Sequence, residues 1–298
     1  MSHKSKIKYS PFSMYFVILA FPIISLSCMR SVKAILFYFL NLSILSTAFS
    51  AVDIIAHRGA SAYAPENTLA SVDLALELDA DGIEIDVHVS ADGRLMVIHD
   101  GSTGRTCNED VIIQKTHSHT LRQLDAGSWK GPEWKDEKIP FLEEVLERVP
   151  LNTKLFIECK TKDPKLFLQA LEPLWSRHQE RLQSSILISF HAPILSAFKR
   201  EYPEQMVIWL IEEMESLEAY ARHIKEGGKR LFDGLGVDHE LGISDHDITT
   251  HLASGHLLSV WTVDQPRWVS YYTSKGFAFF TTNRPDLVQL NKNTQVTK

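Results

Sequence analysis

The sequence predicts an α/β fold, a TIM (β/α)8 barrel with a small insertion after the second strand. From residue 54 onward, short apolar segments alternate with longer helix-like segments, and eight such pairs follow when one hairpin arm is set aside. About 250 residues for eight β/α units is the size of this barrel. Charged and aromatic residues also recur at the ends of the predicted strands, where the fold places its chemistry. With 44% hydrophobic residues, the chain of 298 residues can bury a core.

The first β/α unit and the insertion differ sharply in pattern. We expect the first strand at residues 54–58 and a helix at residues 67–79, capped by Asn67 or Thr68. Residues 101–138 are polar, contain glycine and lack periodicity, which predicts a long insertion that can act as a lid.

The second strand shows the clearest pattern of the chain. Residues 82–89 alternate strictly between apolar and polar side chains, so Glu84 and Asp86 are predicted on one face of a strand. An Asp-Gly turn then returns residues 95–99 as an antiparallel arm. This arm would bring His99 back to the level of Asp86.

The second half of the chain continues the alternation. Strands are predicted where apolar, β-branched and aromatic residues form short runs, and helices where apolar residues recur every three or four positions. In chain order we expect helix 141–148, strand 155–160, helix 164–182, strand 186–190, helix 193–201, strand 207–211, helix 217–225, strand 231–237, helix 247–254, strand 258–264, helix 268–274, strand 277–281 and a closing helix from residue 285.

Residues 1–51 read as a leader that precedes a barrel domain at residues 52–298. Arg30 and Lys33 precede an apolar run at 34–45, and small residues follow it, which is the layout of a secretory signal. Met29 stands directly before Arg30 and is a possible true start. The expected location is therefore the periplasm or the exterior. A membrane anchor through residues 12–45 is the alternative.

Charge and cysteine usage narrow the partners. The net charge is −6, and residues 1–50 hold five basic and no acidic side chains, so the remainder carries −11. Such a body is a poor general binder of nucleic acid, and we expect membrane contact only through the leader. Cys28, Cys107 and Cys159 do not form a disulfide framework. Cys159 is expected to face packing rather than a partner thiol.

Three acidic residues predict a metal site. Glu84 and Asp86 share a strand face, and two neighbouring carboxylates repel each other unless a positive charge neutralises them. Glu158, on the next barrel strand, can complete the set. Oxygen-only ligands suit one hard divalent cation, Ca²⁺ or Mg²⁺. The alternative, a solvated strand face, fits poorly because the opposite face of residues 82–89 is apolar.

Two histidines and two cations accompany the acids. His57 and His99 end apolar strands, and paired imidazoles can act as general base and general acid near neutral pH. A lone histidine in such a place is more often a packed or capping residue. Arg58 offers a bidentate fork for phosphate, and Lys160 offers a point charge. Asp100 either orients His99 or caps the following turn.

Five ordered segments resemble the signature segments of the glycerophosphodiester phosphodiesterase family, and together they span roughly residues 54–287. They are HRGASAYAPENT (57–68), GIEIDVHVSADGRLMVIHD (82–100), IECK (157–160), WTVD (261–264) and TNRPD (282–286). The resemblance implies a TIM barrel with an insertion after the second strand. It also implies hydrolysis of a small-molecule glycerophosphodiester to sn-glycerol 3-phosphate and an alcohol, with a divalent cation.

The resemblance also implies roles for individual positions. Carried over in order, they are an acid/base pair, three metal ligands and two phosphate contacts: His57 and His99; Glu84, Asp86 and Glu158; Arg58 and Lys160. Glu66 and Asn67 match residues that support the site from behind, and Trp261 and Phe190 match apolar walls near the glycerol.

The sequence departs from the family pattern at two positions near the site. Asp264 stands where the family often has Asn, and Asn283 stands where Asp is frequent. Neither change removes an expected ligand, but at both positions the resemblance does not specify which contacts surround the site.

Other functions remain compatible with parts of this pattern. A lysophospholipase D or a sphingomyelinase D-like phosphodiesterase would use the same framework. A non-catalytic phosphodiester-binding protein would need no general acid, so the two histidines argue against it. A barrel glycoside hydrolase also uses paired carboxylates, but it needs neither the second histidine nor the phosphate-type cations.

Overall fold

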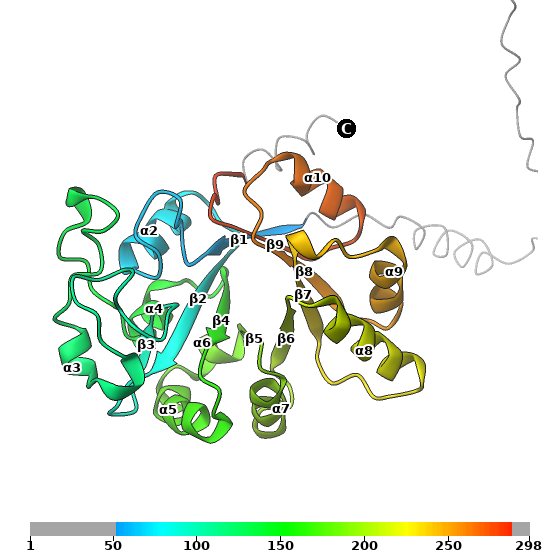
Figure 1. Cartoon of the computed structure of the whole chain (residues 1–298), viewed down its shortest axis with the longest axis horizontal. Coiled ribbons are helices and arrows are strands. Elements are labelled where there is room, and N and C mark those ends of the chain that lie inside the picture. Colours follow the sequence, from blue (N-terminus) through cyan, green and yellow to red (C-terminus); the bar gives the residue numbers. More distant parts are fainter. Residues whose placement is uncertain (1–51, 288–298) are drawn as a thin grey trace, which may run out of the picture. The chain divides into compact units, whose positions relative to one another are not determined.

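The structure, a computed structural model, describes residues 52–287 as a closed barrel of parallel strands surrounded by helices (Figure 1). The strands of the barrel are β1 (Asp53–His57), β2 (Gly82–Val89), β4 (Lys154–Cys159), β5 (Ser185–Ser189), β6 (Met206–Ile211), β7 (Gly234–Asp238), β8 (Leu257–Trp261) and β9 (Phe279–Thr282). Strand β1 pairs in parallel with both β2 and β9, which closes the ring. The predicted TIM barrel is confirmed.

The hairpin arm is also confirmed. Strand β3 (Leu95–Val97) pairs antiparallel with the end of β2, with Val97 opposite Val87. The backbone N–H of Ile98 donates to the carbonyl of Asp86 at 3.0 Å, so the arm returns the next residue, His99, to the level of the acids.

Helices cover the outside of the barrel, as the alternation predicted. They are α2 (Leu69–Glu77), α4 (Leu142–Arg148), α5 (Pro164–Arg177), α6 (Gln179–Gln183), α7 (Ala192–Glu201), α8 (Met214–Lys225), α9 (Asp245–Ala253) and α10 (Arg267–Ser274). The hydroxyl of Thr68 accepts from the N–H of Ser71, so Thr68, not Asn67, caps α2. The helix predicted at 164–182 is divided at His178 into α5 and α6.

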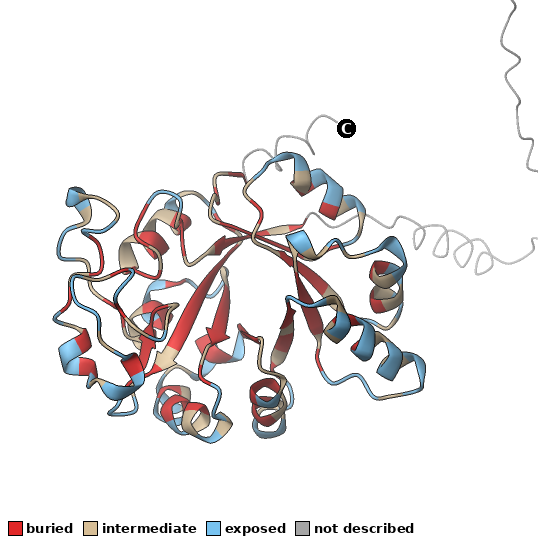
Figure 2. Ribbon diagram, viewed as in Figure 1, coloured by how far each residue is buried: buried red, intermediate tan, exposed pale blue. Residues whose placement is uncertain are grey.

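The core has two apolar layers, one on each face of the barrel strands. The outward side chains of β2, such as Ile83 and Ile85, are fully buried against the helices. A second cluster fills the barrel interior and includes Phe156, Ile208 and Phe279. Figure 2 shows the strands as the most buried part of the molecule. Polar groups on the inward face therefore lie in surroundings that exclude water.

The insertion between β3 and α4 has a core of its own. It contains the short helices η3 (Ile113–Lys115), α3 (Ser118–Leu121) and η4 (Pro132–Trp134). Its buried apolar residues join those of the hairpin arm in one cluster: Met96, Ile98, Ile113, Leu121, Leu124, Ala126 and Ile139. The ammonium of Lys130 donates to the carbonyl of Ser61 at 2.7 Å, which fastens the insertion to the loop after β1. The segment is thus a packed unit and not a bare polar loop.

Several expectations fall on residues outside the described range. The leader at residues 1–51, the possible start at Met29, the anchor at 12–45 and most of the closing helix from residue 285 lie there. Within residues 52–287, none of the helices has the length and apolar character needed to cross a membrane. In this range Cys107 and Cys159 are free thiols, and Cys159 is buried in packing as expected.

Candidate active site

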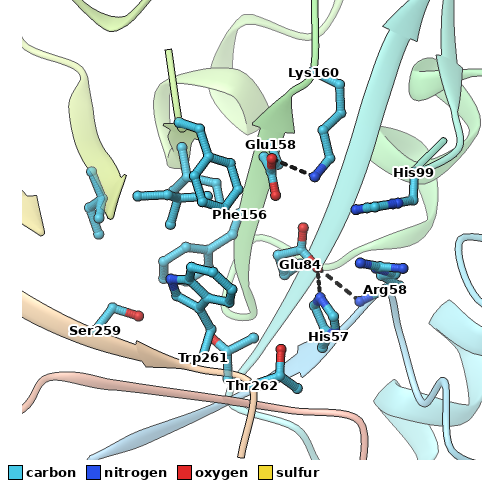
Figure 3. Close-up of a pocket in the computed structure, with 15 residues that line it drawn as sticks. His57, Arg58, Glu84, His99, Phe156, Glu158, Lys160, Ser259, Trp261 and Thr262 are labelled. Atoms are coloured by element: carbon cyan, nitrogen blue, oxygen red, sulfur yellow. Dashed lines mark hydrogen bonds and ion pairs between the residues drawn. The ribbon is translucent and has the colours of Figure 1, made fainter. Parts of the chain in front are cut away.

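A pocket of about 110 Å³ opens at the carboxyl ends of the barrel strands (Figure 3). One side is charged and the other is apolar. The charged side is lined by His57, Arg58, Glu84, His99, Glu158 and Lys160, and the apolar side includes Phe156, Ile188, Phe190, Ile208, Leu210 and Trp261. The ends of strands β1, β2, β4, β5 and β8, with the hairpin arm, thus bring predicted residues to one cavity, and β6 adds apolar lining.

The three acids meet because β2 and β4 are neighbours in register. Asp86 on β2 lies opposite Glu158 on β4, and Glu84 is one repeat earlier on the same face of β2. Glu84, Asp86 and Glu158 each offer an oxygen, and these oxygens all lie within 4.8 Å of one another. All three side chains are buried. Asp86 does not line the pocket surface but lies behind it.

The charge of these acids is only partly balanced by the protein. Burial, reinforced by the charges of Asp86 and Glu158, raises the pKa of Glu84 well above its usual range. Burial and the charge of Asp86 also raise the pKa of Glu158 to about 8. Burial favours the neutral form of Asp86 too, but the charges of Lys160 and Arg58 hold its pKa well below the usual range.

One buried oxygen indicates what would complete the cluster. Within residues 52–287, Oε1 of Glu84 has no hydrogen-bond partner, although it is shielded from water. An unpaired buried carboxylate oxygen is costly unless a cation contacts it. A donor set made only of carboxylate oxygens is the kind that hard divalent cations prefer. The residues present therefore fit a Ca²⁺ or Mg²⁺ ion.

Arg58 is held by the acids and by an unusual backbone conformation. Its φ of 57° lies in the left-handed region, and its backbone N–H donates to Oε2 of Glu84 at 2.9 Å. Strained conformations of this kind are kept at functional sites when the surroundings enforce them. The guanidinium contacts Glu66, with Nη1 at 2.8 Å from Oε1, and Asp86, with Nε at 3.3 Å from Oδ2.

Lys160 and Asn67 complete the surroundings of Asp86. The ammonium of Lys160 lies 2.6 Å from Oε1 of Glu158 and 3.2 Å from Oδ1 of Asp86. The amide of Asn67 donates to Oδ2 of Asp86 at 2.7 Å and accepts from the Asp86 backbone N–H at 3.1 Å. Asn67 therefore clamps Asp86 from behind, while Thr68 caps the helix.

Each histidine is held through Nδ1 by a different kind of partner. Nδ1 of His57 lies 2.8 Å from Oδ1 of Asn283, and Nδ1 of His99 lies 2.6 Å from Oδ1 of Asp100. Asp100 thus orients His99, which was one of two interpretations of the sequence. Burial and the neighbouring Arg58 lower the pKa of His57 to about 4, and burial lowers the pKa of His99. Nε2 is the ring nitrogen left for a ligand in both residues.

The apolar wall includes two aromatic rings, one at the end of β5 and one at the end of β8. Phe190 follows β5 and Trp261 ends β8, and their ring centroids lie 5.3 Å apart in an edge-to-face arrangement. Lys160 links this wall to the charged side, since its ammonium lies 5.6 Å from the centroid of the Phe190 ring. Figure 3 shows Trp261 on the other side of the pocket from His99.

Sequence reasoning missed two residues that support the site. Asn283 was noted only as a departure from the family pattern, and Arg105 was not singled out. Asn283 holds His57 and is itself bound by Asp264, so the two departures contact each other, with Nδ2 of Asn283 at 2.7 Å from Oδ2 of Asp264. Arg105 lies in the polar insertion and contacts Glu66 and Asp100. The insertion carries no periodicity that could have indicated these contacts.

The chain is similar in sequence to one protein family and to individual relatives. The sequence pattern of the Glycerophosphoryl diester phosphodiesterase family matches residues 57–287. The protein YhdW of Bacillus subtilis is 50% identical over 107 residues, which cover 36% of this chain and 44% of that protein, less than half of its length. A glycerophosphodiester phosphodiesterase of the same organism is 29% identical over 248 residues, which cover 78% of this chain and 84% of that protein.

Solved structures agree with the sequence relatives. An Oleispira antarctica phosphodiesterase, in complex with the product sn-glycerol-3-phosphate, has 28% identity and a TM-score of 0.73, covering 82% of this chain and 97% of that one. A glycerophosphodiester phosphodiesterase from Agrobacterium tumefaciens has 26% identity and a TM-score of 0.66, covering 79% of this chain and 98% of that one. Because the family pattern extends over residues 57–287, with the site just described inside it, the chain belongs to the glycerophosphoryl diester phosphodiesterase family.

Proposed function

We propose that this chain hydrolyses glycerophosphodiesters to sn-glycerol 3-phosphate and an alcohol, with one divalent cation, Ca²⁺ or Mg²⁺. The main support is the pocket. It brings two histidines, the side chains of Arg58 and Lys160, and buried carboxylates together at the ends of the barrel strands. Membership of the family supports the reaction, and the product bound to the Oleispira antarctica structure supports the nature of the ligand.

The first requirement is to offset the negative charge of the phosphodiester, which repels nucleophiles. Glu84, Asp86 and Glu158 would hold the cation, which supplies positive charge for the phosphoryl oxygens when bound. Arg58 and Lys160 line the same pocket and can donate N–H groups to those oxygens. Preorganised donors of this kind stabilise the charge that develops in the transition state.

The two histidines move the protons. Nδ1 of His57 donates to the neutral amide oxygen of Asn283, which leaves Nε2 able to accept a proton from the attacking hydroxyl. Nδ1 of His99 is bound by the carboxylate of Asp100, which favours the imidazolium form against the effect of burial, whereas burial lowers the pKa of His99 as a whole. We therefore assign His57 as the base and His99 as the acid that protonates the departing alcohol.

The attacking hydroxyl belongs either to water or to the substrate glycerol. Attack by the 2-hydroxyl of the glycerol gains from proximity and requires a glycerol group free at that position. It forms a cyclic phosphodiester as the alcohol leaves, and water must then open this ring at the 2-oxygen to give glycerol 3-phosphate. Phe190 and Trp261 line the same pocket and offer apolar faces for the glycerol carbons.

One coupled assay tests the proposal. Release of glycerol 3-phosphate is measured over several glycerophosphodiesters, with and without EDTA, and with Ca²⁺ or Mg²⁺ added back. We expect turnover that EDTA abolishes and added cation restores. Release of choline from lysophosphatidylcholine, without action on glycerophosphocholine, would indicate a lysophospholipase D-like enzyme. Tight binding of glycerophosphocholine without product would indicate a binding protein.

We also propose that the protein is exported to the periplasm or the exterior. The signal-like layout around Arg30 and Lys33 supports this. N-terminal sequencing of the protein isolated from its host tests it, and we expect a start near residue 52. An intact N-terminus on a cytoplasmic protein would contradict export, and an intact N-terminus in the membrane fraction would indicate an anchor.

A further inference from the structure

One arginine of the insertion contacts the carboxylates behind both sides of the site. Nε of Arg105 lies 2.7 Å from Oδ2 of Asp100, and Nη1 lies 2.8 Å from Oε2 of Glu66. Glu66 in turn contacts Arg58, and Asp100 contacts His99. We propose that Arg105 is a positioning residue that sets Arg58 and His99 for the reaction through these two carboxylates.

The contact with Glu66 is bidentate and shared between two guanidiniums. Both Nη atoms of Arg105 bind the carboxylate, at 2.8 and 2.7 Å, and Oε1 also accepts from Nη1 of Arg58 at 2.8 Å. Glu66 is largely buried, with 13% of its side chain exposed. Bidentate pairing fixes the plane of a carboxylate as well as its position. The orientation of Glu66, and with it that of Arg58, therefore depends on Arg105.

The contact with Asp100 acts on the opposite side of the site. Nε and Nη2 of Arg105 bind the two oxygens of Asp100, at 2.7 and 3.2 Å. Oδ1 of Asp100 lies 2.6 Å from Nδ1 of His99. Hydrogen bonds from Arg105 are the main reason why the pKa of Asp100 falls to about 2, so this group is an anion at neutral pH. A fixed carboxylate holds the ring of His99 in one orientation.

These contacts join into one chain in which carboxylates alternate with guanidiniums and which ends at the His99 ring. In order, its members are Asp86, Arg58, Glu66, Arg105, Asp100 and His99. Arg105 is the member that the insertion supplies. It links Arg58, the proposed phosphate contact, to His99, the proposed proton donor. Its side chain is 44% exposed, so a substitution opens no core cavity.

Removal of Arg105 leaves two carboxylates without their shared partner. Glu66 would then draw Arg58 more strongly to itself and away from a phosphate, which raises KM. Asp100 would be free to rotate, and His99 with it, which lowers kcat. Supporting residues of this kind typically change activity about 10–100-fold when removed. A residue that served stability alone would lower the folded fraction without changing kcat or KM per folded molecule.

The kinetic experiment compares Arg105→Ala and Arg105→Lys with the matched control Arg122→Ala. Arg122 is also an insertion arginine and pairs with Glu144 and the Ile139 carbonyl, away from the pocket. We expect kcat/KM to fall about 10–100-fold in Arg105→Ala. Arg105→Lys should recover only part of the loss. Lysine keeps the positive charge, but one ammonium cannot replace both bidentate contacts. The control should stay within about twofold of the wild type, because neither Arg122 nor its partner Glu144 lines the pocket.

A double variant tests whether Arg105 acts through Asp100. If it does, Arg105→Ala combined with Asp100→Asn lowers kcat no further than Asp100→Asn alone. Fully additive losses would overturn the inference. So would wild-type kinetics in Arg105→Ala, or a loss no greater than that of Arg122→Ala once the folded fraction is measured by circular dichroism.

The kinetic test rests on the proposed function. A second readout is therefore chosen that does not depend on turnover. The ring signals of His99, assigned by their loss in His99→Ala, are followed by NMR at a fixed pH. We expect them to shift in Arg105→Ala and to stay in place in Arg122→Ala. Unchanged His99 signals in Arg105→Ala would overturn the inference. Absence of turnover in the wild type would count against the proposed function and leave this spectroscopic test intact.

Discussion

Asp264 fixes Asn283, and Asn283 fixes the ring of His57. Nδ2 of Asn283 lies 2.7 Å from Oδ2 of Asp264, and the backbone N–H of Asn283 donates to Oδ1 of Asp264 at 2.8 Å. Because a carboxylate can only accept from this amide, Oδ1 of Asn283 must face Nδ1 of His57, 2.8 Å away. Nδ1 therefore carries the proton, and Nε2 of His57 keeps its lone pair for the pocket.

Asn283→Ala should lower kcat by about 10–100-fold with little change in KM, because the loss falls on the orientation and tautomer of His57 and not on phosphate binding. Steady-state kinetics on the best glycerophosphodiester measures this. The exposed Asn152, at the opposite end of the barrel before β4, is the matched control, and Asn152→Ala should behave as the wild type. A wild-type kcat in Asn283→Ala would remove Asn283 from the mechanism.

His57→Ala and His99→Ala should each reduce turnover by about 10²–10⁴-fold, the usual contribution of a general acid or base. The pocket holds both rings, each supported at Nδ1. Initial rates at saturating substrate measure the effect. His119 on α3 is exposed and serves as the control, with wild-type rates expected for His119→Ala. Near-normal rates in both pocket variants would end the acid/base assignment.

The parts of the structure that sequence reasoning predicted are those governed by local periodicity. The strict alternation of residues 82–89 specified β2, including which side chains face the barrel interior. The same reasoning placed Glu158 and Lys160 together, because β4 follows the same alternation. Parallel strands in register then bring their carboxyl ends to one mouth, so the pocket follows from the strand pattern.

The missed features depend on contacts between distant residues. Arg105 binds Glu66, 39 positions away, and Asn283 binds His57, 226 positions away. Neither pairing leaves a periodic signal, because each is made by one side chain in a loop. Asn67 precedes a helix and has a capping side chain, yet its φ of 59° turns it toward Asp86. Whether the Asn67 side chain caps the helix or binds Asp86 is therefore decided by the tertiary structure.

Removal of the cation should lower stability as well as activity. A ligand that binds the folded state alone raises the melting temperature. We expect Ca²⁺ or Mg²⁺ to raise the melting temperature of the wild type after EDTA treatment. Glu84→Gln should lose this rise, and without cation it should be at least as stable as the wild type, because one of the mutually repelling carboxylates is gone.

Differential scanning fluorimetry measures these shifts. Glu144→Gln is the matched control, since Glu144 pairs with Arg122 in the region of the insertion and lies outside the acidic cluster. It should keep the full rise with added cation. A rise of equal size in Glu84→Gln would place the cation elsewhere, and chelator-insensitive turnover of the wild type would count against the three-carboxylate site.

Stability should fall between pH 7 and pH 5 partly through a buried histidine far from the pocket. His256 is 3% exposed, and Nε2 lies 3.2 Å from the hydroxyl of Tyr220. Nδ1 lies 3.3 Å from the carbonyl of His251, so the neutral ring satisfies both contacts by donating at Nδ1 and accepting at Nε2. Burial, and next the neighbouring His251, lowers the pKa of His256 to about 4.

The sign of the effect follows from proton linkage. The unfolded chain binds a proton at His256 near the ordinary pKa of about 6.5, whereas the folded state resists it down to about 4. The stabilisation is therefore complete above pH 6.5 and is lost progressively as the pH falls to 4. Urea unfolding of His256→Gln should show a shallower loss between pH 7 and pH 5 than the wild type, whereas His246→Gln, at an exposed site, should not. Equal slopes in all three proteins would mean that the His256 ring accepts a proton without disturbing the packing around Tyr220.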